Sequence, residues 1–143
     1  MCIRDSFYPY DPKARILLWP WGLQLARMIQ GKDYEWSPRN AEMGKYWTTK
    51  HKVDALVEMM ALVDYAARID LAQIKVPTIV IYTKKDTVIS PDHIEAAFVR
   101  LGSPRKELVD LPGGTMHNIA SALLAPENVP EVSRRISEFM ANE

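Results

Sequence analysis

The spacing of apolar residues divides the chain near residue 74 into a helical part and a part that contains strands. Three helices are predicted in the first part, from Gly22 to Gln30, from Arg39 to Lys50 and from Lys52 to Arg68. Gly31 ends the first of them, and the last keeps its apolar residues at helical spacing. The run Ile16-Leu17-Leu18 is the one strand-like stretch expected there.

After residue 74 the pattern becomes that of alternating strands and helices. The continuous apolar run Thr78-Ile79-Val80-Ile81-Tyr82 is typical of a parallel strand that is covered on both faces. A helix follows Ser90-Pro91-Asp92, a second strand runs from Lys106 to Leu111, and a final helix follows Asn128. This order predicts an α/β fold with an incomplete parallel sheet, because two strands are too few for a doubly wound sheet.

Two residues that could carry chemistry stand after these two strands. Asp86 follows the first strand, and His117 follows the second strand and its Pro112-Gly113-Gly114 turn. In open α/β sheets, functional groups gather at the carboxyl ends of the strands. A histidine that moves a proton and a buried carboxylate that orients it are two of the three groups in a Ser-His-Asp triad. A turn aspartate and a solvated loop histidine are the alternative interpretation.

The residues around Asp86 and His117 resemble a known family. Val76 to Tyr82 together with Asp86-Thr87-Val88 resembles the acid-bearing strand and turn of the α/β-hydrolases, and Leu111 to His117 resembles their histidine loop. Residues 7–70 are similar to the lid of esterase-like and acylglycerol-lipase-like members. The resemblance implies the C-terminal portion of an α/β-hydrolase, with a doubtful leader at 1–6, a helical lid segment at 7–70 and a core segment at 71–143.

The resemblance further implies that Asp86 is the triad acid and His117 the base, while the nucleophile is missing from this chain. None of the seven serines lies in a G-x-S-x-G elbow, and Ser103 stands in the wrong order along the chain. We therefore expect the serine upstream of the chain, in a complete protein that cleaves carboxylic esters, and we expect this fragment alone to be inactive. Two alternatives stay open: a non-catalytic binding module derived from a hydrolase, and a fragment of an epoxide hydrolase or dehalogenase with an aspartate nucleophile.

Other residues are weaker candidates. Substrate-binding residues of an apolar acyl pocket are predicted among the aromatic and methionine residues of the lid segment, which could instead pack a helical cluster: Trp19, Trp21, Met59 and Met60. Asp110 is a rival for the orienting carboxylate, but its place before the turn favours a structural role. His51 and His93 are interpreted as solvated, and the three histidines have no ligand-like spacing, so no metal and no cofactor are expected.

Composition limits the partners. The 18 basic residues balance the 18 acidic ones, so no nucleic-acid partner is expected. The resemblance implies a small ester as the substrate. The single cysteine, Cys2, forms no internal disulfide, and no stretch approaches the roughly 20 apolar residues of a transmembrane helix. The cytoplasm is favoured, although a missing N-terminus would leave the compartment open. Without a further strand beside it, the exposed edge of strand 78–82 is expected to make the fragment self-associate.

Overall fold

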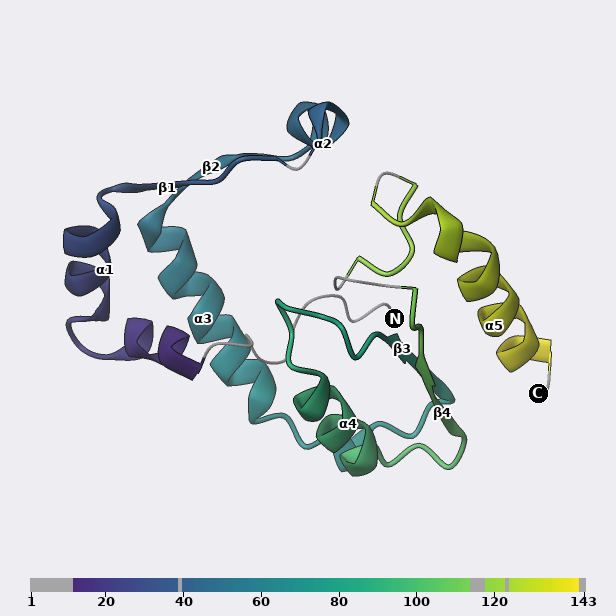
Figure 1. The fold of residues 1–143 in the computed structure, drawn as a ribbon. Coiled ribbons are helices and arrows are strands. Elements are labelled where there is room, and N and C mark those ends of the chain that lie inside the picture. Colours follow the sequence, from purple (N-terminus) through teal and green to yellow (C-terminus); the bar gives the residue numbers. More distant parts are fainter. Residues whose placement is uncertain (1–11, 39, 114–117, 123, 142–143) are drawn as a thin grey trace. The chain divides into compact units, whose positions relative to one another are not determined.

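The computed structural model describes residues 12–38, 40–113, 118–122 and 124–141 (Figure 1). Its contacts divide the chain into two compact units. One unit is Asp11–Arg68, and the other contains the residues from Ile69 onward. His117, the predicted base, lies outside the described residues, as does the predicted leader at 1–6.

The unit Asp11–Arg68 is mainly helical, as expected, with one small sheet. Its elements are the 3-10 helix η1 (Pro12–Leu18), α1 (Gly22–Gln30), β1 (Asp33–Glu35), α2 (Ala41–Tyr46), β2 (Lys50–Lys52) and α3 (Val53–Ala67). The expected strand at residues 16–18 is wrong, because these residues belong to η1. The sheet was not predicted either: β1 and β2 pair antiparallel, with Tyr34 opposite His51. The helix predicted at 39–50 is therefore shorter in the structure, where it is α2, and His51 lies on β2.

Long side chains and ion pairs hold the helices of this unit together. Val53, Met43 and Met60 are buried, and α3 contacts both η1 and α1. The Arg27 guanidinium of α1 makes two hydrogen bonds to the Asp54 carboxylate of α3, at 3.0 and 2.7 Å. These bonds lower the pKa of Asp54 and raise that of Arg27. Gly31, with φ at 84°, ends α1 in a conformation that favours glycine.

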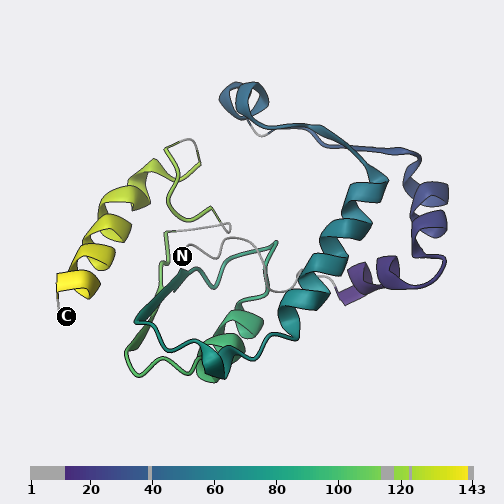
Figure 2. The ribbon, with the colours of Figure 1, turned by 180° about the vertical axis from the view of Figure 1, so that it is seen from behind.

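The second unit has the predicted alternation of strands and helices. Its elements are η2 (Leu71–Gln73), β3 (Thr78–Tyr82), α4 (Pro91–Arg100), β4 (Lys106–Asp110), η3 (Pro126–Asn128) and α5 (Val129–Ala141). The strands β3 and β4 are parallel and in register from Thr78 opposite Lys106 to Tyr82 opposite Asp110. The helices α4 and α5 lie on opposite sides of this pair in both views (Figures 1 and 2). The parallel arrangement predicted from the sequence is confirmed.

Helix α4 and η2 approach each other closely where α4 ends. The Gly102 N–H donates to the carbonyl of Leu71 at 3.1 Å. A Cβ atom on Gly102 would lie 1.9 Å from the backbone oxygen of Ala72. Glycine is therefore required here by the contact between the two backbones.

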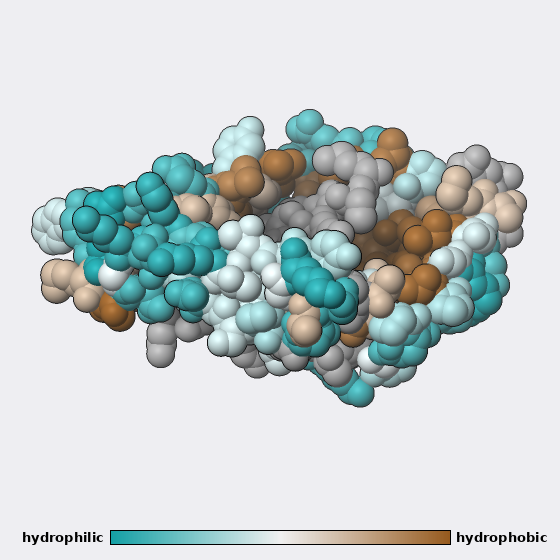
Figure 3. Space-filling model, turned by 90° about the horizontal axis from the view of Figure 1, so that it is seen from above, coloured by the Kyte–Doolittle hydropathy of each residue, from teal (hydrophilic) through white to brown (hydrophobic). Residues whose placement is uncertain are grey.

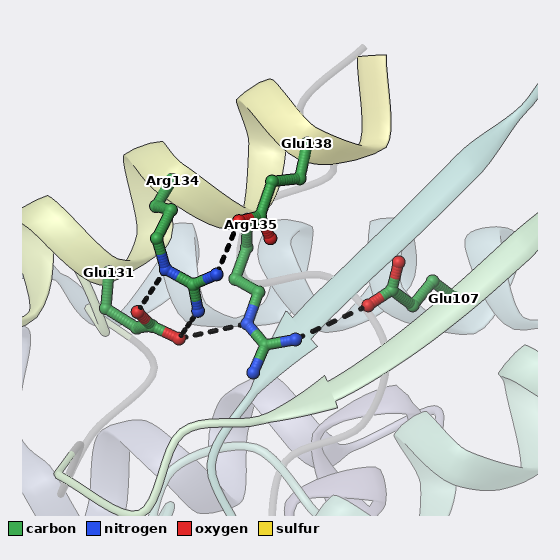
Figure 4. A network of polar contacts seen from close by, with 5 residues as sticks. All are labelled: Glu107, Glu131, Arg134, Arg135 and Glu138. Atoms are coloured by element: carbon green, nitrogen blue, oxygen red, sulfur yellow. Dashed lines mark hydrogen bonds and ion pairs between the residues drawn. The ribbon is translucent and has the colours of Figure 1, made fainter. Parts of the chain in front are cut away.

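Helix α5 is joined to β4 by a network of charged residues (Figure 4). Arg134 and Arg135 both donate to Glu131, and Arg134 also donates to Glu138 at 2.6 Å. Arg135 lies 3.9 Å from Glu107 of β4, which ties the helix to the strand. The hydrogen bonds from the two arginines lower the pKa of Glu131 to about 2.

The sheet is less covered than its sequence predicts. Four of the five residues of β3 are only half-buried, and Tyr82 alone is buried. Large hydrophobic side chains are also exposed on the helices, such as Val99 at 75% and Met140 at 64%, and hydrophobic residues lie open on the surface when the molecule is viewed from above (Figure 3). In the described part of the chain, β3 pairs with β4 alone, so the expected burial on both faces is not reached. None of the described helices is long and apolar enough to span a membrane.

Candidate active site

The carboxyl ends of β3 and β4 lie side by side because the strands are parallel neighbours. The last ladder bond between them runs from the Leu111 N–H to the carbonyl of Tyr82, at 2.8 Å. Beyond this bond, β3 continues into the turn that contains Asp86, and β4 continues into the Pro112-Gly113 turn. The edge at which the sequence places both candidate residues is thus formed by two adjacent turns.

Asp86 is buried, with 5% of its surface exposed. Its Oδ1 accepts hydrogen bonds from the backbone N–H groups of Val88 at 2.8 Å and Ile89 at 3.1 Å. Its own N–H donates to the carbonyl of Thr83 at 3.2 Å. Both of these side-chain bonds end on Oδ1. A carboxylate held in this way at one oxygen can accept a hydrogen bond from an imidazole at the other.

Two side chains tie the Asp86 turn to the end of β4. The Lys84 N–H donates to Oδ1 of Asp110 at 3.1 Å. The Nζ of Lys85 donates to the carbonyl oxygen of Pro112 at 2.9 Å. Asp110, the rival for the orienting carboxylate, therefore binds the backbone of the Asp86 turn.

The Pro112-Gly113 turn also contacts a buried amide. Asn128 is 9% exposed, and its Oδ1 lies 2.7 Å from the position that a Cβ atom on Gly113 would occupy. The Nδ2 of Asn128 is buried and has no hydrogen-bond partner within the part of the chain that the structure describes. A side chain at position 113 would require this amide to shift, so the glycine allows the close approach.

The segment after the Pro112-Gly113 turn contains His117, which the structure does not describe. The described residues on its two sides are Gly113, packed on Asn128, and Asn118, which is buried at 7% exposed. The structure thus places the predicted acid and the beginning of the predicted histidine loop at one edge of the sheet. The contact between Asp86 and His117 itself stays a prediction.

The hydroxyl of buried Tyr82 and a half-buried carboxylate lie close to this edge. The Tyr82 hydroxyl donates to Oε1 of Glu95 on α4, at 2.5 Å. Burial first, and then the hydrogen bond and the charge of Glu95, raise the pKa of Tyr82. Lys84 lies 3.8 Å from the same carboxylate. Tyr82 is therefore a neutral side chain that joins β3 to α4.

The remaining candidates have structural contacts or lie elsewhere. The hydroxyl of Ser103 is buried and donates to the carbonyl of Arg105 at 2.6 Å. His51 lies beside Tyr34, with the two rings stacked at 6.2 Å between centroids. In the described ranges, no group of three or more His, Cys, Asp or Glu side chains is arranged to hold a metal ion.

The predicted substrate-binding residues all lie in the unit Asp11–Arg68. Met60 is buried at 3% exposed, whereas Trp19, Trp21 and Met59 are exposed. An open pocket of about 430 Å³ in this unit has a charged lining instead, formed by Arg27, Lys32, Asp33, Lys52 and Asp54. The predicted apolar acyl pocket is therefore not formed by this cavity, and the role of the four residues stays a prediction.

Sequence reasoning missed two residues of the candidate site. The sequence pattern assigns no role to Lys85, and it places Asn128 only before the final helix. Both act through contacts with residues far along the chain, at Pro112 and Gly113. The glycine at 113 was a signal for close approach, but it did not identify the residue that approaches.

Comparison with known proteins gives a matching family model and similar solved structures. A family model described as "Serine aminopeptidase, S33" matches residues 25–121. The structure of a soluble variant of monoglyceride lipase from Saccharomyces cerevisiae, in complex with a substrate analog, is similar with a TM-score of 0.59 and 14% sequence identity. The similarity covers 90% of this chain and 51% of that one, so the chain spans about half of its length. At this identity the likeness shows the fold. No curated protein matches the sequence.

Proposed function

Because the chain belongs to the serine aminopeptidase S33 family of α/β-hydrolases, we propose that it supplies the acid and the base of a hydrolase that cleaves carboxylic esters. Asp86 is the triad acid in this proposal, and His117 is the base. The nucleophilic serine comes from a segment outside residues 1–143, since none of the serines in the sequence stands in a G-x-S-x-G elbow.

The observation that supports the proposal most directly is the setting of Asp86. It is a buried carboxylate at the carboxyl end of a parallel strand, and two backbone N–H groups hold one of its oxygens. The neighbouring strand leads into the loop that contains His117. In a triad, the acid keeps the imidazole in the correct tautomer and stabilises the imidazolium that forms when the serine loses its proton. The imidazole then donates this proton to the leaving group.

Two substrate classes fit this chemistry. The structural neighbour is a monoglyceride lipase, which favours an ester, whereas the family description names an aminopeptidase, which favours the amide at a peptide N-terminus. The exposed aromatic and methionine side chains of the unit Asp11–Arg68, including Trp19, Trp21 and Met59, support an apolar acyl group. We therefore propose the ester as substrate and keep the aminoacyl amide as the second candidate.

The proposal is tested on the product of the reading frame extended upstream of residue 1 in its source DNA. We expect it to hydrolyse p-nitrophenyl butyrate faster than alanine p-nitroanilide, and the reverse order would favour the aminopeptidase. Asp86→Asn should lower kcat by about 10⁴-fold, as loss of the correct histidine tautomer does in a triad. Asp110→Asn is the matched control and should keep kcat within about tenfold of the parent. Equal losses for both variants would contradict the assignment of Asp86.

The 143-residue chain itself gives an independent test. A fluorophosphonate probe labels activated serines, and we expect no stoichiometric labelling of this chain because no serine in it can become acylated. Labelling of one serine would overturn the proposal that the nucleophile lies outside it.

We also propose that the chain self-associates through the edge of β3 that β4 does not cover. Ile79, Val80 and Ile81 are half-buried, and an unpaired strand edge presents backbone donors and acceptors to another chain. Light scattering after size-exclusion chromatography should show species larger than 16.3 kDa. Val80→Lys should reduce these species, and a strictly monomeric parent chain would contradict the proposal.

A further inference from the structure

Lys85 stands next to the proposed triad acid and contacts the neighbouring turn. Its own N–H donates to Oγ1 of Thr83 at 3.3 Å, so the lysine belongs to the same turn as Asp86. Its Nζ reaches across to the carbonyl oxygen of Pro112 at 2.9 Å. The side chain thus connects the turn that contains the acid with the turn that leads toward His117.

This contact lies just beyond the end of the strand ladder. The last backbone bond between the strands is the one from Leu111 to Tyr82. After it, the described bonds between the two turns come from side chains, at Asp110 and at Lys85. A bond between an ammonium group and a carbonyl is stronger than one between neutral groups, so Lys85 can hold the first residue after β4 where the ladder no longer does.

The next residue of the same turn contacts Asn128. The buried amide of Asn128 packs against Gly113, directly after Pro112. A turn that is held by Lys85 on one side and supported by Asn128 on the other has little freedom to move away from Asp86. The two contacts thereby limit the positions of Pro112 and Gly113 relative to the acid.

We propose that Lys85 is a positioning residue of the hydrolase: through Pro112 it sets the beginning of the histidine loop relative to Asp86, and so controls the coupling between acid and base. This inference rests on the proposed function, because it requires that Asp86 and His117 act as a pair. Lys85 itself touches no reacting atom.

The coupling can be measured in the 143-residue chain without any activity. Diethyl pyrocarbonate modifies neutral imidazole, so the rate of modification of His117 as a function of pH gives its pKa. Peptide mass spectrometry reads this rate at micromolar protein concentration, and the peptides with His51 and His93 are internal references. If Asp86 faces His117, Asp86→Asn lowers the pKa of His117 by about one unit or more, because a nearby carboxylate favours the imidazolium.

The proposal predicts that Lys85→Met shrinks this effect of Asp86→Asn to less than half. The four chains compared are the parent, Asp86→Asn, Lys85→Met and the double variant. Comparing the effect of Asp86→Asn with and without Lys85 cancels the direct effect of the lysine charge on the pKa of His117. Lys85→Arg keeps a cationic donor and should keep the full effect. Lys84→Met removes the same charge from the adjacent position, which is also exposed and whose Nζ lies 3.8 Å from Glu95 instead, and should keep the full effect.

The outcomes separate the two proposals. If Asp86→Asn leaves the pKa of His117 unchanged in the parent chain, the acid–base pair is wrong, and the role of Lys85 fails with it. If Asp86→Asn lowers the pKa equally with and without Lys85, the pair stands and the positioning role is overturned. Equal losses of coupling in Lys85→Met and Lys84→Met would also overturn it, because the effect would then be general to charge in this turn.

Discussion

Replacement of Lys106 by methionine should destabilise the unit that contains the candidate site. Lys106 is the first residue of β4, and its Nζ donates to three backbone carbonyls at the end of α4: Phe98 at 3.0 Å, Val99 at 3.0 Å and Leu101 at 2.8 Å. The ammonium also lies 5.1 Å from the centre of the Phe98 ring. Methionine keeps most of the apolar stem and removes the charge and all three donors, so the variant isolates the polar contacts.

The size of the effect follows from the geometry. A hydrogen bond to a charged group contributes about 1.5–3 kcal/mol, and a cation at a helix C-terminus adds about 0.3–1 kcal/mol. The three bonds share one ammonium that is only half-buried, and the carbonyls regain water when it is removed, so the contributions do not add. We expect a loss of about 2 kcal/mol in the free energy of unfolding, which lowers Tm by about 4–8 °C in a chain of this size.

The assay must report on the unit from Ile69 onward. All four tryptophans lie between residues 19 and 47, so tryptophan fluorescence reports on the other unit. Hydrogen exchange of the α4 peptides, read by mass spectrometry, together with urea unfolding followed by circular dichroism, measures the relevant free energy. Lys84→Met is the matched control, because its exposed ammonium makes only a 3.8 Å ion pair with Glu95. A cost for Lys106→Met within about 0.5 kcal/mol of this control would refute the reasoning.

Two further predictions concern the packing of this unit. Gly102→Ala should lower the free energy of unfolding by at least about 2 kcal/mol, because its Cβ would lie 1.9 Å from the backbone oxygen of Ala72, which cannot rotate away. The loss is measured as a fall in Tm, and an unchanged Tm would contradict the close approach. Glu131 has its pKa lowered from an ordinary value of 4.5 to about 2 by hydrogen bonds from Arg134 and Arg135, so its contribution to stability is complete above about pH 4.5 and is lost as the pH falls toward 2. Urea unfolding measured between pH 7 and 2 should therefore show that the parent and Glu131→Gln differ in free energy of unfolding near neutral pH, and that this difference shrinks as the pH falls. A difference that stays constant with pH would count against the network.

The elements that the sequence predicted correctly have local signals. Ser90-Pro91-Asp92 marks the start of α4, and Gly31 marks the end of α1. The parallel pairing of β3 with β4 follows from the helix between them, because a crossover connection returns the chain in the same direction. The two helix boundaries depend on residues that are close together along the chain, and the pairing depends on the order of the elements.

The sheet of β1 and β2 lacked such a signal. The strands have three residues each, Asp33–Glu35 and Lys50–Lys52, and they are mostly charged, without the apolar alternation that identifies a strand. Their pairing depends on residues that a whole helix, α2, separates along the chain. Residues 16–18 failed for the opposite reason, because three apolar residues are too short a run to distinguish a strand from a helical turn.

The candidate site divides in the same way. The position of Asp86 could be predicted, since it depends on one strand and one turn. The bond from Lys85 to Pro112 and the contact between Asn128 and Gly113 could not, because each joins residues that no sequence periodicity relates. These contacts depend on tertiary packing. Residues that support a candidate site from elsewhere in the sequence are therefore harder to predict than Asp86 itself.

The sequence of β3 is more apolar than its observed contacts require. Its run of β-branched residues, Ile79, Val80 and Ile81, is typical of a strand inside a sheet, yet all three are half-buried. At about 25 cal/mol per Å² of apolar surface, leaving such side chains partly open forgoes stabilisation that a further strand and its covering helices would supply. The composition of β3 therefore fits an internal strand of a larger sheet better than an edge. The same larger sheet would hold the nucleophile that Asp86 and His117 require, so a single upstream segment would satisfy both the packing of β3 and the chemistry of the proposed triad.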